Sequence, residues 1–159
     1  MQITIVGVGK IKEKFMIKAI DEYKKRLTRY CRLNIVEIVD EKAPENLSEK
    51  QKELIKETEG QKILSFLKDN MYVIAMDIQG RSLSSEALAE KIQQLGLKGD
   101  SNLAFIIGGS LGLSAEVINK ADFRLSLSVM TFPHQLTRLI LLEQIYRSFK
   151  IIKNEPYHK

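Results

Sequence analysis

Short apolar runs along the chain alternate with longer stretches in which apolar residues recur every three or four positions. The short runs predict buried β-strands, and the longer stretches predict helices with one apolar face. The predicted strands cover residues 3–8, 33–39, 72–76, 103–107 and 123–127; the predicted helices cover residues 13–30, 44–70, 115–120 and 133–153, with another that Ser82 or Ser84 caps and Gly96 ends. This alternation indicates an α/β fold, with a mostly parallel sheet and helices on both faces. The pattern contains neither repeats nor linkers, so residues 1–159 are predicted to form a single domain.

The predicted helix over residues 44–70 is the most charged part of the chain. Its apolar stripe is thin, and Gly60 near its middle predicts a weak point or a bend. Oppositely charged pairs such as Glu59 and Lys62 would contribute only a few tenths of a kcal/mol each. We interpret this helix as a cover with a solvated outer face and without catalytic chemistry.

The composition argues against several classes of protein. The 159 residues are 44% hydrophobic and 28% charged, as in soluble globular proteins. No apolar run approaches the roughly 20 residues of a membrane span, and the start of the chain lacks the pattern of a signal peptide. Cys31 is the single cysteine and the chain has two histidines, so neither an internal disulfide nor a zinc site is expected. We expect a cytoplasmic protein that binds no metal and no membrane.

The net charge of +5 is concentrated at the two ends of the chain. Residues 1–32 hold nine basic and three acidic side chains, and residues 138–159 hold five basic and two acidic ones. Basic segments suit a polyanionic partner, because Lys and Arg supply most of the sequence-independent affinity for nucleic-acid phosphates. Charge alone leaves a second interpretation open, which is a solvated surface that keeps the protein soluble.

A glycine-rich turn follows the predicted strand over residues 103–107 and leads through Ser114, a good N-cap, into a helix. Open α/β sheets bind ligands at such turns, beyond the carboxyl ends of the strands. A dinucleotide site would also have a carboxylate at the end of the next strand, which is absent here, so phosphate binding is disfavoured. An adenosyl group fits better, since small, apolar or hydroxylic residues follow the predicted strands: Met76, Gly108, Leu127, Ser128, Val129, Met130, Thr131 and Phe132. The alternative is that the glycines only form a tight turn and that Met76 only fills the core.

Two histidines and a charged pair are the candidates for chemistry near the C-terminus. His134 and His158 are candidate general bases, because a free imidazole titrates near about 6.5; His134 could instead serve only the start of its helix. Glu143 and Arg147 stand at (i, i+4) spacing. They form either a weak surface ion pair or an RNA-contacting arginine held by its carboxylate partner. Tyr146 could stack on a base, or lie in the core or a subunit interface.

Four segments carry a resemblance to a known family: Ile106-Ile107-Gly108-Gly109-Ser110-Leu111-Gly112, Leu125-Ser126-Leu127-Ser128-Val129-Met130-Thr131-Phe132-Pro133-His134-Gln135-Leu136, Glu143-Gln144-Ile145-Tyr146-Arg147 and Pro156-Tyr157-His158-Lys159. They resemble the ribosomal RNA large subunit methyltransferase H family of the SPOUT, or α/β-knot, superfamily. The resemblance covers the whole chain and implies a C-terminal trefoil knot, in which the last helix threads through a loop. It also implies that Met76, Gly108 and residues 127–132 bind S-adenosylmethionine. The family more often carries leucine where this chain has Met76, and backbone contacts would survive that change.

The resemblance further implies the reaction, which is methyl transfer from S-adenosylmethionine to N3 of a pseudouridine in large-subunit (23S) ribosomal RNA within the assembled ribosome. It implies catalytic roles for His158, Tyr157, Arg147 and Glu143. Arg138, Lys150 and Lys159 are the candidate contacts to RNA. The superfamily implies a homodimer in which the tail reaches the cofactor pocket of the partner. Two alternatives remain, a non-catalytic RNA-binding or ribosome-associated factor with the same fold and a nucleotide-dependent enzyme on a parallel sheet.

Overall fold

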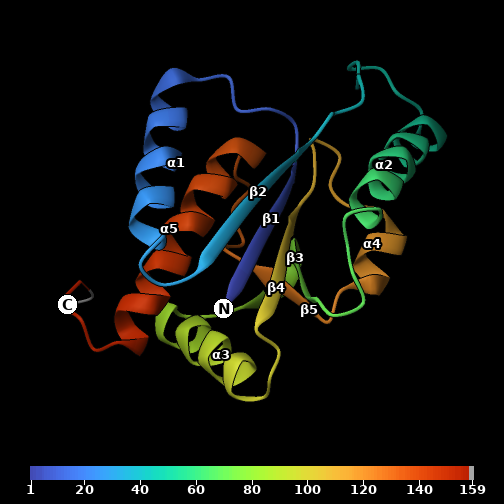
Figure 1. Cartoon of the computed structure of the whole chain (residues 1–159). Coiled ribbons are helices and arrows are strands. Elements are labelled where there is room, and N and C mark those ends of the chain that lie inside the picture. Colours follow the sequence, from blue (N-terminus) through green and yellow to red (C-terminus); the bar gives the residue numbers. More distant parts are fainter. Residues whose placement is uncertain (158–159) are drawn as a thin grey trace.

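The computed structural model describes residues 1–157, which are built around one five-stranded parallel sheet (Figure 1). The strands are β1 (Gln2–Val8), β2 (Arg32–Ile38), β3 (Tyr72–Ser82), β4 (Asn102–Ile107) and β5 (Phe123–Ser126), in the order β2-β1-β4-β3-β5. The helices are α1 (Lys14–Leu27), α2 (Glu49–Leu64), α3 (Ser85–Leu97), α4 (Ala115–Lys120) and α5 (His134–Ile152). Each neighbouring pair of strands is parallel, so the predicted type of sheet is confirmed.

Alternate side chains of the central strand β4 face two separate cores. Leu103, Phe105 and Ile107 pack with residues of α1, α3 and α5, whereas Ala104 and Ile106 pack with residues of α2 and α4. All five side chains are buried, which explains why β4 is an uninterrupted apolar run in the sequence. Figure 1 shows the same division, with α1 and α5 on one side of the sheet and α2 and α4 on the other.

Serine side chains set the start of three helices. Ser48 forms a capping box with Gln51, so α2 begins at Glu49 and is shorter than the predicted helix over residues 44–70. Ser84 caps α3 and Ser114 caps α4. Helix α3 continues one residue beyond its predicted end at Gly96. None of the helices within residues 1–157 has both the length and the apolar character needed to cross a bilayer.

Strand β3 is longer than the apolar run that predicted it. Its register against β5 shifts between Met76 and Arg81, so residues 77–80 bulge at the carboxyl end of the sheet. Gly80 permits this bulge, because a Cβ there would lie 2.7 Å from the backbone carbonyl carbon of Arg124. The bulge therefore lies beside the loops that leave β4 and β5 at the same edge.

Residues 127–133 return the chain from β5, at one edge of the sheet, to α5, which packs against α1 and α3. The start of α5 lies close to the end of β1, since a Cβ on Gly9 would be 3.1 Å from Nε2 of His134. This return passes along the carboxyl ends of the strands. The threading of α5 through a loop stays a prediction of the family resemblance.

Candidate cofactor pocket and active site

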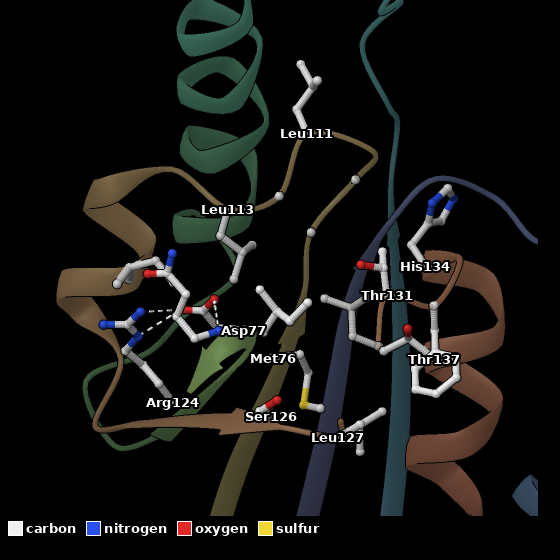
Figure 2. A pocket seen from close by; sticks show the side chains of 18 of the residues that line it. Met76, Asp77, Leu111, Leu113, Arg124, Ser126, Leu127, Thr131, His134 and Thr137 are labelled. Carbon is white, nitrogen blue, oxygen red and sulfur yellow. Dashed lines mark hydrogen bonds and ion pairs between the residues drawn. The ribbon is translucent and has the colours of Figure 1, made fainter. Parts of the chain in front are cut away.

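A cleft of about 1170 Å³ opens at the carboxyl ends of β3, β4 and β5 (Figure 2). Three segments form most of its lining: residues 76–79 at the bulge within β3, residues 107–113 at the end of β4 and just beyond it, and most of residues 124–134. Small-molecule sites commonly measure about 300–1,000 Å³, so this cleft has room for a nucleoside-sized ligand and part of a second molecule. The structure brings the glycine-rich turn and the segment after β5 together, as the sequence predicts.

The glycine-rich turn after β4 folds back on itself. Gly109 and Gly112 form an antiparallel bridge, in which the N–H of Gly112 donates to the carbonyl oxygen of Gly109 at 3.1 Å. A Cβ on Gly108 would lie 2.7 Å from the carbonyl carbon of Gly112, and Gly112 has a φ of 85°. Glycine fits both positions, because one is a close approach of backbones and the other is left-handed. The glycines therefore set the compact shape of the turn, whose residues 108–113 line the cleft.

Two serine hydroxyls fix the segment after β5. Oγ of Ser126 donates to the carbonyl oxygen of Ser128 at 3.0 Å, and Oγ of Ser128 accepts from the N–H of Met130 at 3.0 Å. Five of the six residues predicted here to bind a cofactor line the cleft: Leu127, Ser128, Met130, Thr131 and Phe132. Val129 is absent from the lining and is 88% exposed, so its cofactor contact stays a prediction.

Met76 and Gly108 line the cleft, and an ion pair that sequence reasoning missed lies beside them. Oδ2 of Asp77 is 2.8 Å from Nε and 2.5 Å from Nη2 of Arg124, and this pair forms one wall of the cleft (Figure 2). It ties the bulge of β3 to β5. The sequence feature that could have predicted this pair is Asp77, a carboxylate directly after the apolar run over residues 72–76. Polar residues at such positions often line a ligand site.

His134 lies in the first turn of α5 and lines the cleft on the side away from Asp77 (Figure 2). Burial lowers the pKa of its imidazole, and the Arg138 guanidinium acts in the same direction, while Asp40 opposes both. The ring is therefore neutral near neutral pH and can accept a proton from a ligand in the cleft.

Comparison with known proteins identifies the family. Residues 1–158 match the family described as "Predicted SPOUT methyltransferase". The chain belongs to this family. Two similar proteins are the ribosomal RNA large subunit methyltransferases H of Alkaliphilus oremlandii and Clostridium novyi, which are 64% and 65% identical over 159 residues and aligned over all of both chains. The solved structure of a probable methylase family protein from Haemophilus influenzae has a TM-score of 0.56 at 14% identity, covers 99% of this chain and 70% of that one, and supports the fold.

In this SPOUT methyltransferase, Arg138 lies inside the protein. Its side chain is 1% exposed, Nη1 donates to Oε1 of Glu37 at 2.7 Å, and Nη2 donates to the carbonyl oxygen of Gly9 at 3.0 Å. A Cβ on Gly7 would overlap the guanidinium, so the end of β1 is shaped to receive it. The prediction that Arg138 contacts RNA was therefore wrong, and the residue anchors the first turns of α5 to the sheet.

Glu143, Arg147 and Tyr157 form a cluster of their own. Arg147 donates to Oε1 of Glu143 from Nε at 3.0 Å and from Nη2 at 2.7 Å, and the Tyr157 hydroxyl donates to the same oxygen at 3.1 Å. None of the three lines the cleft of its own chain within the described residues. Glu143 follows His134 by nine residues of α5, which is about 14 Å along the helix axis. The structure thus brings three predicted catalytic residues together, but away from the cleft of the same chain.

Lys150 takes part in holding the start of the tail. Its ammonium is 2.6 Å from Oε2 of Glu155, and that oxygen also accepts from the Tyr30 hydroxyl at 2.5 Å. Because the Lys150 side chain is only 13% exposed, its charge is committed to this internal pair. The contact between Lys150 and RNA stays a prediction, and it would require this ion pair to open or to be shared.

Tyr146 belongs to an aromatic cluster between α1, α5 and the tail. Its ring centroid is 5.0 Å from that of Tyr157 and 6.1 Å from that of Tyr23, in edge-to-face arrangements. These contacts favour the core interpretation of Tyr146 over stacking on a base. The two other predicted tail residues, His158 and Lys159, lie outside the described residues.

Proposed function

We propose that the protein transfers a methyl group from S-adenosylmethionine to N3 of a pseudouridine in large-subunit ribosomal RNA, within the assembled ribosome. The observation that carries this proposal is the cleft itself, in which the bulge of β3 meets the segments that follow β4 and β5. Membership of the SPOUT methyltransferase family supports methyl transfer. The full-length similarity to two ribosomal RNA large subunit methyltransferases H supports the RNA substrate.

The lining of the cleft fits an adenosyl cofactor. Gly108 and Gly112 let the cofactor approach the turn after β4, where backbone N–H and C=O groups would read the edge of the adenine. The partly buried side chains of Met76 and Leu127 supply an apolar surface for its ring. Thr131 offers a hydroxyl to the ribose or to the methionine part. Within residues 1–157, no three or more His, Cys, Asp and Glu side chains are grouped so that they could hold a metal ion.

For this reaction the protein must align the methyl group with N3 and provide a group that accepts the imide proton. S-adenosylmethionine supplies an activated methyl group on its sulfonium. A bond forms from N3 to that methyl while the sulfur–methyl bond breaks, and the imide proton must leave N3. Correct placement of the two reactants contributes several kcal/mol, and a general base contributes on the order of 10²–10⁴ in rate. His134 is a neutral imidazole in the cleft, and His158 is the other candidate. Burial and the Glu143 carboxylate raise the pKa of Tyr157, so its neutral hydroxyl is suited to donating a hydrogen bond and not to accepting the imide proton.

We propose a homodimer with composite sites. Tyr157 is held against Glu143, Arg147 and Tyr146, and this cluster does not line the cleft of its own chain. A second copy would bring a cleft to the end of this anchored segment. In that arrangement Glu143 and Arg147 position Tyr157 near the partner's cofactor, and the second copy does the same in return.

One face of α1 provides a surface for RNA. Its exposed side carries Lys14, Lys18 and Lys25, which fall within a sector of about 40° at 100° per residue, opposite the buried Ile20 and Leu27. The exposed Arg29 follows two residues after the helix ends. The acidic residues on either side are paired with other cations, Asp21 with Lys24 and Glu22 with Arg26. We call these four residues the α1 basic stripe and propose that it contacts ribosomal RNA phosphates.

The test is a methylation assay on the natural substrate. Ribosomes that lack the modification are incubated with the protein and a labelled methyl donor, and the label is then mapped to a base. Label on N3 of one pseudouridine is expected, and turnover should fall sharply in His158→Ala and after removal of residues 157–159. Label on another atom would refute the assignment. The non-catalytic alternative predicts that the protein binds ribosomes without binding S-adenosylmethionine, which a calorimetric titration decides.

A further inference from the structure

Two adjacent residues of α2 contact the two ends of the glycine-rich turn. Glu59 lies against Gly109 at the start of the turn, and Gly60 lies against Ser114 at its end. Both α2 residues are buried, although most of the helix is exposed or half-buried. The sequence suggested that this helix is only a cover. In the structure it packs onto the loop that lines the proposed cofactor site.

The Glu59 carboxylate is wedged between two backbone segments. Its side chain is 4% exposed, and Oε1 accepts from the N–H of Glu41 at 2.9 Å. Oε2 would be 2.9 Å from a Cβ on Gly109, and Oε1 would be 3.4 Å from it. The carboxylate thus occupies the space that a side chain at residue 109 would need, and the backbone of the turn rests directly on it.

Gly60 allows the other end of the turn to come equally close. A Cβ on Gly60 would overlap Oγ of Ser114 and lie 3.1 Å from Cβ of Ser114. Ser114 is buried and caps α4 by accepting from the N–H of Val117 at 3.4 Å. Because both ends of the turn are seated on one rigid helix, the turn has little freedom to open or shift.

Burying a carboxylate is costly, so the side chain at this position is held there by specific contacts. An apolar residue or an amide of similar size would fill the space with a smaller desolvation cost. The carboxylate contacts the loop before α2 and the backbone of the cofactor turn. Its placement is therefore best explained by the position that it imposes on Gly109.

We infer that Glu59 is a positioning residue, which sets the backbone of residues 108–112 in the conformation that binds the adenosyl cofactor. Glu59 does not line the cleft, so it acts through Gly109. This inference rests on the proposed S-adenosylmethionine site. Helix α2 already supplies Glu53 and Lys56 to the edge of the cleft. According to the inference, it also holds the side of the turn that faces away from the cleft.

The first experiment measures the Kd of the full-length protein for S-adenosylmethionine by calorimetry. Glu59→Ala is expected to weaken binding about tenfold, which corresponds to about 1.4 kcal/mol. Glu59→Gln keeps the size of the side chain and an acceptor for the Glu41 N–H, and is expected to stay within about threefold of the wild type. Glu57→Ala is the matched control, since Glu57 is an exposed residue of the same helix.

The second experiment is a double-mutant cycle with Gly109→Ala, whose added methyl would push against the carboxylate. Gly109→Ala alone is expected to weaken cofactor binding more than Glu59→Ala does, and the double variant should bind more tightly than Gly109→Ala. Glu59→Asp replaces Glu59→Ala in the cycle if the latter does not fold. If the wild type binds the cofactor but Glu59→Ala matches it, or if the effects of the two substitutions on binding simply add, the inference is overturned. A wild type that does not bind S-adenosylmethionine would refute the proposed function itself.

Discussion

The guanidinium of Arg138 forms an ion pair with the carboxylate of Glu37, with 2.7 Å between Nη1 and Oε1. The pair joins the first turns of α5 to the end of β2, and a hydrogen bond from Nη2 to Gly9 adds the end of β1. The side chain of Arg138 is 1% exposed, whereas that of Glu37 is 35% exposed. Arg138 thus fixes the start of α5, and His134 one turn earlier, relative to the sheet that carries the cleft.

Removing this guanidinium should destabilise the fold. We expect Arg138→Met to lower the free energy of unfolding by roughly 3 kcal/mol, because a buried charge pair loses one partner. Arg29→Met, at an exposed position, should change it by less than about 0.5 kcal/mol. Chemical denaturation of both variants measures the difference. If Arg138→Met left stability unchanged but weakened ribosome binding, the result would support a direct contact between Arg138 and RNA.

The site at the carboxyl edge of the sheet was predictable because it follows from strand order. Parallel strands end at one edge, so the glycine turn after β4 and residues 127–132 after β5 had to emerge there, and they line one cleft. Ser114 likewise predicted the start of α4 correctly.

Tertiary packing decided what the sequence could not show. The position of Arg138 in the helical pattern is compatible with an exposed side chain. In the fold its guanidinium instead fills the space beside Gly7 at the end of β1, where a larger residue would collide with it. Gly60 suggested a bend, yet α2 runs through it without interruption and uses it for close contact with Ser114. Tyr157 does not line the cleft of its own chain. A local sequence pattern cannot show this, because it depends on how α5 and the tail pack in three dimensions.

The buried carboxylate of Glu59 should make stability depend on pH. Burial raises the pKa of Glu59, and Asp40 and Glu41 add to the rise, while the hydrogen bond from the Glu41 N–H and the charge of Lys62 oppose it. The native state therefore holds this proton more tightly than the unfolded chain does. Below the pKa of Glu59 in the unfolded chain, the carboxyl is neutral in both states and ionisation does not affect the free energy of unfolding. As the pH rises through the higher pKa of the folded state, that free energy falls to its lower, fully ionised value.

Glu59→Gln removes that cost and should raise the free energy of unfolding at pH 7 to 8. The gain should shrink as the pH falls through the folded pKa and vanish at about pH 4 or below, where the wild-type carboxyl is also neutral. Denaturation at a series of pH values tests this, with the exposed Glu57→Gln as the control. A gain of the same size at every pH would mean that packing, not ionisation, causes it.

The α1 basic stripe should control the salt dependence of ribosome binding. Replacing Lys14, Lys18, Lys25 and Arg29 by Gln should flatten the slope of log K against log salt by up to about 3, because each neutralised phosphate contributes about 0.7–0.9 to that slope. Binding of S-adenosylmethionine should not change, since none of the four lines the cleft. The control replaces four exposed lysines elsewhere, Lys42, Lys50, Lys68 and Lys98. Equal effects on ribosome binding in the two quadruple variants would show that only net charge matters.

Two inactive chains should restore each other if the tail acts on the partner's cleft. One chain lacks residues 157–159 but keeps its pocket. The other carries Gly108→Val, whose added side chain would collide with the carbonyl carbon of Gly112, 2.7 Å from a Cβ at residue 108. A random 1:1 mixture holds half of its chains in mixed dimers, each with one intact pocket facing one intact tail, so about a quarter of the wild-type rate is expected. Co-expression with two affinity tags isolates the mixed dimer for the ribosome methylation assay. A mixed dimer that binds S-adenosylmethionine in its intact pocket yet stays inactive would show that the tail serves its own chain, because neither chain then has both a pocket and a tail.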